Sequence, residues 1–144
     1  MAVRLHPESL DPWALLQRYQ RHYVGGMGAT AVFVGSMRDC NEGDAVTAMT
    51  LEHYPGMTEK VLKAIEAETR AAWDVLDLLV AHRVGEVVPG DPIVLVAVWS
   101  AHRKAAFEVC RVVMERLKSD APFWKRETLR DGSTRWVEKN TAGY

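Results

Sequence analysis

Ile93-Val-Leu-Val-Ala-Val-Trp99 is the most apolar stretch of this chain, and Ser100-Ala-His-Arg103 follows it directly. A continuous run of β-branched and other apolar residues is typical of a strand that is buried on both faces. The turn residues Val88-Pro-Gly-Asp91 precede the run, and Ser100 can cap a helix that begins after it. The sequence therefore predicts a central strand over 93–99, with a helix directly behind it.

The helix after this strand is expected to continue to about Lys118, because Asp120-Ala-Pro122 ends it. Its buried stripe is predicted from helical spacing to consist of Phe107, Cys110, Met114 and Leu117. Beyond Pro122, the segments 123–129 and 134–138 are expected to be extended. Asp131-Gly132 lies between them and favours a terminal hairpin.

Working toward the N-terminus, the same reasoning gives the remaining elements. Asp11 and Pro12 are typical of a helix start, and the glycines at 25–28 end that helix. The other predicted elements are strands over 29–35, 46–53 and 75–82, a polar loop over 38–44 and a helix over 57–73. Helices and strands mix without a regular βαβ repeat and adjacent extended segments favour antiparallel pairs, so we predict an α+β fold.

Composition limits the class of protein. A chain of 144 residues, 48% hydrophobic and 26% charged, has the size and balance of one globular domain, which we place over residues 1–144. The chain has no apolar run long enough to cross a membrane, and its first residues lack the layout of a signal peptide, so a cytoplasmic location is expected. Cys40 and Cys110 have no metal-ligand spacing, and neither a metal nor another cofactor is predicted.

The net charge of −1 conceals an asymmetry. Residues 1–100 carry 8 Lys and Arg against 13 Asp and Glu, whereas residues 101–144 carry 10 against 6. A basic C-terminal third favours a local anionic ligand, although ordinary solvated charge explains it equally well. The excess is too small to favour nucleic acid, so an RNA-binding domain is the weakest of the hypotheses.

Lys118 and Lys125 stand on either side of Pro122. A rigid bend can bring the two ammonium groups to one cleft, where each would lower the pKa of the other and make one of them a nucleophile or base. The alternative is structural: Lys118 would complement the helix dipole and Lys125 would be a solvated strand residue. Spacing alone leaves both interpretations open.

Three further residues are candidate anion contacts. His102 and Arg103 open the helix behind the central strand, where backbone N–H groups favour anions, and Arg38 lies on the polar loop. Capping and surface charge are equally consistent with these positions. His82, Arg83 and Glu86 are expected to form a partly buried polar cluster without a catalytic role.

Five strings occur in one order along most of the chain: 51–57 (Leu-Glu-His-Tyr-Pro-Gly-Met), 82–85 (His-Arg-Val-Gly), 89–91 (Pro-Gly-Asp), 100–103 (Ser-Ala-His-Arg) and 121–127 (Ala-Pro-Phe-Trp-Lys-Arg-Glu). Together they resemble the large, catalytic subunit of molybdopterin synthase. The resemblance implies an α/β hammerhead with an added antiparallel part. It also implies a sulfur transferase that converts cyclic pyranopterin monophosphate to the dithiolene of molybdopterin. The sulfur would arrive as the C-terminal thiocarboxylate of a small ubiquitin-like partner, and the large subunits would pair as a homodimer within a heterotetramer.

The resemblance also assigns roles. It places the essential lysines at Lys118 and Lys125, and the substrate's anion contacts at Arg38, His102 and Arg103. Lys139 stands near the place where such proteins often carry an arginine that reaches the neighbouring subunit, and a lysine cannot form the same bidentate contact. A non-catalytic scaffold that binds a ubiquitin-like tail or an anionic pterin is the alternative function, since it needs the same pocket.

Overall fold

The computed structural model describes residues 2–20 and 25–137. Within these residues the helices are α1 (Pro12–Gln20), α2 (Met57–Ala72) and α3 (Arg103–Ser119). The strands are β1 (Ala2–His6), β2 (Ala29–Ser36), β3 (Cys40–Asn41), β4 (Asp44–His53), β5 (Asp77–Arg83), β6 (Gly85–Val87), β7 (Pro92–Ser100), β8 (Phe123–Leu129) and β9 (Thr134–Trp136).

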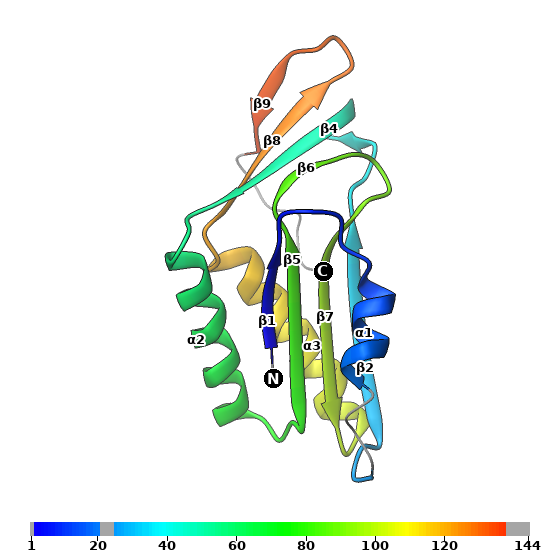
Figure 1. Cartoon of the computed structure of the whole chain (residues 1–144), viewed down its shortest axis with the longest axis vertical. Helices are drawn as coiled ribbons and strands as arrows, with labels where there is room; N and C mark the ends of the chain where they lie inside the picture. Colours follow the sequence, from blue (N-terminus) through cyan, green and yellow to red (C-terminus); the bar gives the residue numbers. More distant parts are fainter. Residues whose placement is uncertain (1, 21–24, 138–144) are drawn as a thin grey trace.

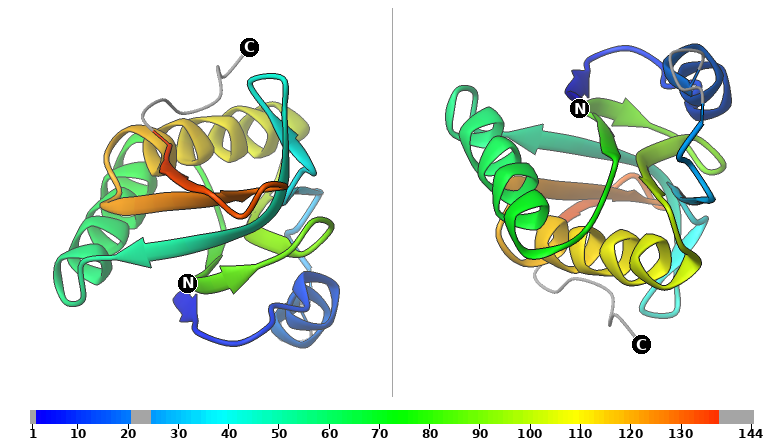
Figure 2. Two further views of the ribbon diagram at one scale, coloured as in Figure 1. Left: turned by 90° about the horizontal axis from the view of Figure 1, so that it is seen from above. Right: turned by 90° about the horizontal axis from the view of Figure 1, so that it is seen from below.

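The predicted central strand is confirmed as β7. The first sheet has the strand order β1-β5-β7-β2, and β7 is antiparallel to both of its neighbours. β1, which no sequence pattern predicted, joins the edge in parallel with β5. Helices α2 and α3 cover one face of this sheet and α1 covers the other, as Figures 1 and 2 show.

The alternation of side chains along β7 explains why it is apolar throughout. Val94, Val96 and Val98 pack toward α2 and α3, while Leu95, Ala97 and Trp99 pack toward α1. Because both faces are covered, neither can carry polar side chains at low cost. Full burial of each large apolar side chain contributes about 1.5–3 kcal/mol, so β7 anchors both layers of the core.

A second sheet crosses one end of the first (Figure 1) and has the order β3-β4-β8-β9, with β6 also paired to β4. Its central pair is antiparallel and sets Leu51 of β4 opposite Lys125 of β8. The predicted terminal hairpin is confirmed as β8 and β9, and the predicted polar loop contains the short strand β3. The fold is therefore α+β, as predicted.

The predicted stripe of α3 was wrong at Phe107, and Met114 is only partly buried. The buried residues of this helix are Ala106, Val109, Cys110, Val113 and Leu117, whereas Phe107 is 69% exposed. Ala106, Val109 and Val113 instead form the face of α3 that packs against the first sheet. Phe107 is thereby left at the edge of a pocket.

Candidate functional site

A pocket of about 600 Å³ lies between β2 and α3 and extends to the start of β8. One wall is apolar and includes two partly exposed aromatic side chains, Phe33 (41%) and Phe107 (69%). His82, Lys118 and Lys125 line the end near β8, and Arg111 and Glu115 of α3 also contribute to the lining. The pocket therefore combines an apolar channel with a basic end.

The bend at Pro122 is what brings the two lysines together. Lys118 is in the last turn of α3, and the chain reverses through a turn in which Phe123 N–H donates to the Ala121 carbonyl at 2.9 Å. β8 then starts at once, and its alternation places Phe123 and Lys125 on the same inward face. The two lysines that the sequence singled out thus line one pocket.

The electrostatics of Lys125 are unusual. Burial, followed by the charge of Lys118 and a hydrogen bond shared with it, lowers the pKa of Lys125 to about 8. Arg38 acts in the same direction, while Glu127 opposes the shift. A pKa of about 8 leaves roughly a tenth of the molecules with a neutral amine at pH 7, compared with almost none for an ordinary lysine. Lys125 can therefore act as a base or a nucleophile near neutral pH.

His82 is a pocket residue that the sequence analysis left without a role. Its imidazole is stacked on Phe123, with ring centroids 3.8 Å apart and planes 10° from parallel, and its Nδ1 lies 2.7 Å from the Arg83 carbonyl oxygen. Burial lowers the pKa of His82 to about 4, with Lys125 and Lys118 contributing to the shift. The ring is therefore neutral at physiological pH. The sequence signal that could have indicated this pocket residue is a histidine directly after the apolar residues 78–81 of β5.

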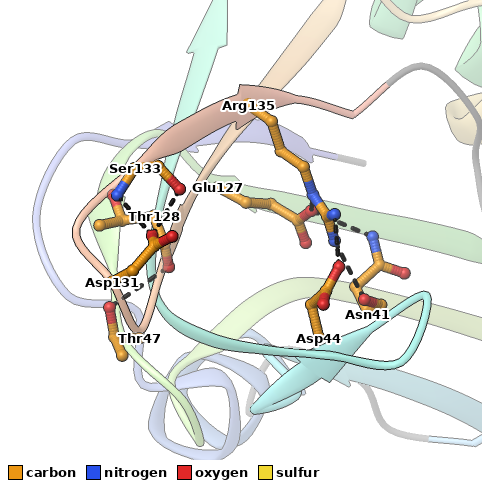
Figure 3. Close-up of polar contacts among 8 residues, drawn as sticks. All are labelled: Asn41, Asp44, Thr47, Glu127, Thr128, Asp131, Ser133 and Arg135. Carbon is orange, nitrogen blue, oxygen red and sulfur yellow. Dashed lines mark hydrogen bonds and ion pairs between the residues drawn. The ribbon is translucent and has the colours of Figure 1, made fainter.

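A buried carboxylate connects the lysine strand to the polar loop (Figure 3). Glu127 Oε1 accepts hydrogen bonds from Asn41 Nδ2 and Arg135 Nε, each at 3.1 Å. Arg135 also donates to Asp44 Oδ2 at 2.8 Å and to the Asn41 carbonyl at 3.0 Å. The guanidinium of β9 thus fastens the hairpin that follows Arg38 to the strand that carries Lys125.

The three predicted anion contacts do not lie together in one copy of the chain. Arg38 is exposed but close enough to Lys125 to lower its pKa. His102 and Arg103 are exposed at the N-terminal end of α3, the end opposite Lys118. Arg103 and Lys118 are fifteen positions apart in the helix, which corresponds to about 22 Å along the axis. A single copy of the chain does not bring Arg103 to the lysine pair.

Residues 2–20 and 25–137 contain no group of three or more His, Cys, Asp or Glu that could hold a metal ion. Across the same residues, no helix is long and apolar enough to cross a bilayer. Lys139 lies outside the described residues.

Comparison with known proteins gives one consistent result. The MoaE protein family matches residues 5–120. A molybdopterin synthase catalytic subunit from Pseudomonas aeruginosa is 49% identical over 138 residues, which cover 96% of this chain and 91% of that protein. Two solved structures have the same fold. A molybdopterin biosynthesis MoaE protein from Burkholderia ambifaria is 44% identical, with a TM-score of 0.77 over 99% of this chain and 92% of that one. Molybdopterin synthase from Staphylococcus aureus is 30% identical, with a TM-score of 0.82 over 92% of this chain and 94% of that one.

Proposed function

Because this chain belongs to the MoaE family, whose members include molybdopterin synthase catalytic subunits, we propose that it catalyses sulfur transfer in the synthesis of the molybdenum cofactor. Residues 1–144 act as one domain in this proposal. The sulfur donor is the C-terminal thiocarboxylate of a small ubiquitin-like subunit. The acceptor is cyclic pyranopterin monophosphate, which becomes the dithiolene of molybdopterin.

The observation that carries the proposal is the shared pocket of Lys118 and Lys125. Its apolar wall suits an extended peptide tail, and its basic end suits the anionic sulfur-bearing terminus of that tail. Lys118 stabilises or transiently captures the acyl group as the carbon–sulfur bond is broken. Lys125, with its pKa lowered to about 8, transfers protons or holds the pterin phosphate.

The substrate phosphate requires further cations, and Arg38, His102 and Arg103 are the residues proposed to supply them. Arg38 acts on the same pocket, because its charge is felt by Lys125. Arg103 lies at the far end of α3 from Lys118, so it would have to reach the pocket of a second copy of the chain. The proposal therefore includes a homodimer, with a small subunit at each lysine pocket and the phosphate between copies.

The location is proposed to be the cytoplasm. Cys40 is exposed and Cys110 is buried, and both are unpaired, as thiols are in a reducing compartment. Burial raises the pKa of Cys110 to about 11. Its thiol is therefore protonated and unreactive at neutral pH, which fits a reaction whose sulfur is brought by the partner.

The test is a reconstituted reaction. The purified chain is mixed with a thiocarboxylated small subunit and cyclic pyranopterin monophosphate, and the dithiolene product is measured by mass spectrometry. We expect product in amounts that exceed the enzyme. If components that are active with another synthase give no product here, the catalytic proposal is wrong and the chain is a scaffold that binds the tail or the pterin.

A further inference from the structure

His82 is the one titratable side chain of the row Leu78, Val80 and His82, which β5 directs toward α2 and α3. The residue is 7% exposed, and the exposed part opens into the pocket of the two lysines. A buried imidazole in a row of apolar residues costs stability unless its nitrogens have partners. The contacts of its two ring nitrogens therefore indicate what it does.

The contacts of His82 fix its tautomer. A carbonyl oxygen only accepts hydrogen bonds, so the 2.7 Å contact with Arg83 requires the proton to be on Nδ1. In a neutral ring Nε2 then carries a lone pair. Nε2 has no hydrogen-bond partner in the described part of the chain, and this atom is not fully buried. It therefore reaches solvent, and the pocket is where the ring opens.

The His82 ring lies beside the lysine strand, and His82 and Lys125 line the same pocket. His82 stacks on Phe123, and Phe123 precedes Lys125 by two residues on the same face of β8. Of the charged groups that act on His82, Lys125 has the largest effect, followed by Lys118. The Lys125 amine can donate to Nε2 whether it is charged or neutral, and in its neutral form it can at the same time accept from Lys118.

We propose that His82 is a positioning residue of this site, whose neutral imidazole offers Nε2 as a hydrogen-bond acceptor when the Lys125 amine turns toward it. The hydrogen bonds then run in one direction, from Lys118 to neutral Lys125, from Lys125 to His82, and from His82 to the Arg83 carbonyl. The contact restrains a long side chain that would otherwise sample several rotamers. The catalytic consequence rests on the proposed sulfur transfer, whereas the hydrogen bond itself does not.

Several charged groups set the background for this contact. Lys118 comes from α3, Glu127 from β8 and Arg38 from the loop before β3, and all three act on Lys125. His53 of β4 acts on His82, and its own Nδ1 lies 3.3 Å from the Thr58 hydroxyl. A test must therefore change His82 alone and be compared with a change at His53.

The test measures the pKa of Lys125 in the protein alone, from the pH dependence of its ¹³Cε chemical shift. His82→Phe keeps a flat ring on Phe123 but removes the acceptor, so the ammonium form of Lys125 loses a partner. We expect the pKa of Lys125 to fall by about one unit, and His82→Gln, which retains an acceptor oxygen, to restore most of the loss. His53→Phe removes the other ring beside Phe123 and should leave the pKa of Lys125 unchanged.

An unchanged pKa of Lys125 in His82→Phe overturns the proposal, because a residue that only fills space would behave in this way. If His82→Phe does not fold, His82→Gln and His82→Met form the comparison, and equal pKa values in these two variants overturn it. In the sulfur-transfer assay, His82→Phe should lower kcat by at least about tenfold. If the wild-type protein forms no dithiolene, the proposed function fails, while the Lys125 titration still decides the role of His82.

Discussion

Replacing Lys118 by Met should raise the pKa of Lys125. The structure gives the size of the effect. The pKa of Lys125 lies at about 8 against an ordinary value of 10.5, and burial is the largest cause, followed by the charge of Lys118 and the hydrogen bond with it. Methionine keeps the length and apolar stem of lysine but removes the like charge, while burial remains. Removing the charge of Lys118 should therefore reverse less than half of the lowering of the Lys125 pKa. We expect this pKa to rise by about one unit, equivalent to about 1.4 kcal/mol.

The assay is a pH titration of the ¹³Cε resonance of Lys125 in protein labelled at lysine. The chain has six lysines, so the resonance can be assigned from its loss in Lys125→Met. The matched control is Lys104→Met, because Lys104 is an exposed residue near the opposite end of α3. If the pKa of Lys125 stays within about 0.2 unit of wild type in Lys118→Met, the two amines do not interact and the electrostatic reasoning is refuted.

Three other changes have defined outcomes. Between pH 8 and 10.5 the Lys125 side chain binds more protons in the unfolded chain than in the folded one, so the stability of the wild-type protein should rise with pH in this window. Lys125→Met should abolish this rise and increase stability at pH 7 by up to about 3 kcal/mol, measured as a higher Tm. An unchanged Tm and an unchanged dependence of stability on pH would contradict the buried charge. Arg135→Ala leaves the buried carboxylate of Glu127 with fewer partners and should lower the midpoint of urea unfolding, with little recovery in Arg135→Lys. Full recovery in Arg135→Lys would show that the forked contact is unimportant. A Cβ at Gly28 would overlap the Ala101 carbonyl oxygen, so Gly28→Ala should cost about 1–3 kcal/mol, and a stability equal to wild type would contradict this close approach.

The parts of the fold that the sequence predicted are those in which one strong local pattern agrees with burial. β7 is such a case, because apolar residues on both faces fit only a covered central strand. β1 was missed because it is short and polar at Arg4, and because its parallel partner β5 lies more than seventy residues away in sequence. The three-residue strand β6 is defined by its partner β4 and not by its own residues.

The site shows the same division. The proline bend between Lys118 and Lys125 was a local feature, and the structure places both lysines in one pocket. His82 could not be assigned in this way, since its place beside Phe123 depends on how two sheets meet. The distance between Arg103 and Lys118 follows from the length of α3, which the sequence predicts. No local sequence pattern shows that a second copy of the chain would bring Arg103 to a lysine pocket.

The most direct test of the central claim compares single-turnover sulfur transfer by Lys118→Ala and by the control Lys104→Ala, together with the affinity of each for the thiocarboxylated small subunit. We predict that Lys118→Ala lowers the rate of dithiolene formation by at least about 100-fold, with its Kd for the small subunit within about threefold of wild type. Lys104→Ala should match wild type in both. Wild-type rates of product formation by Lys118→Ala would contradict a catalytic role for the lysine pocket.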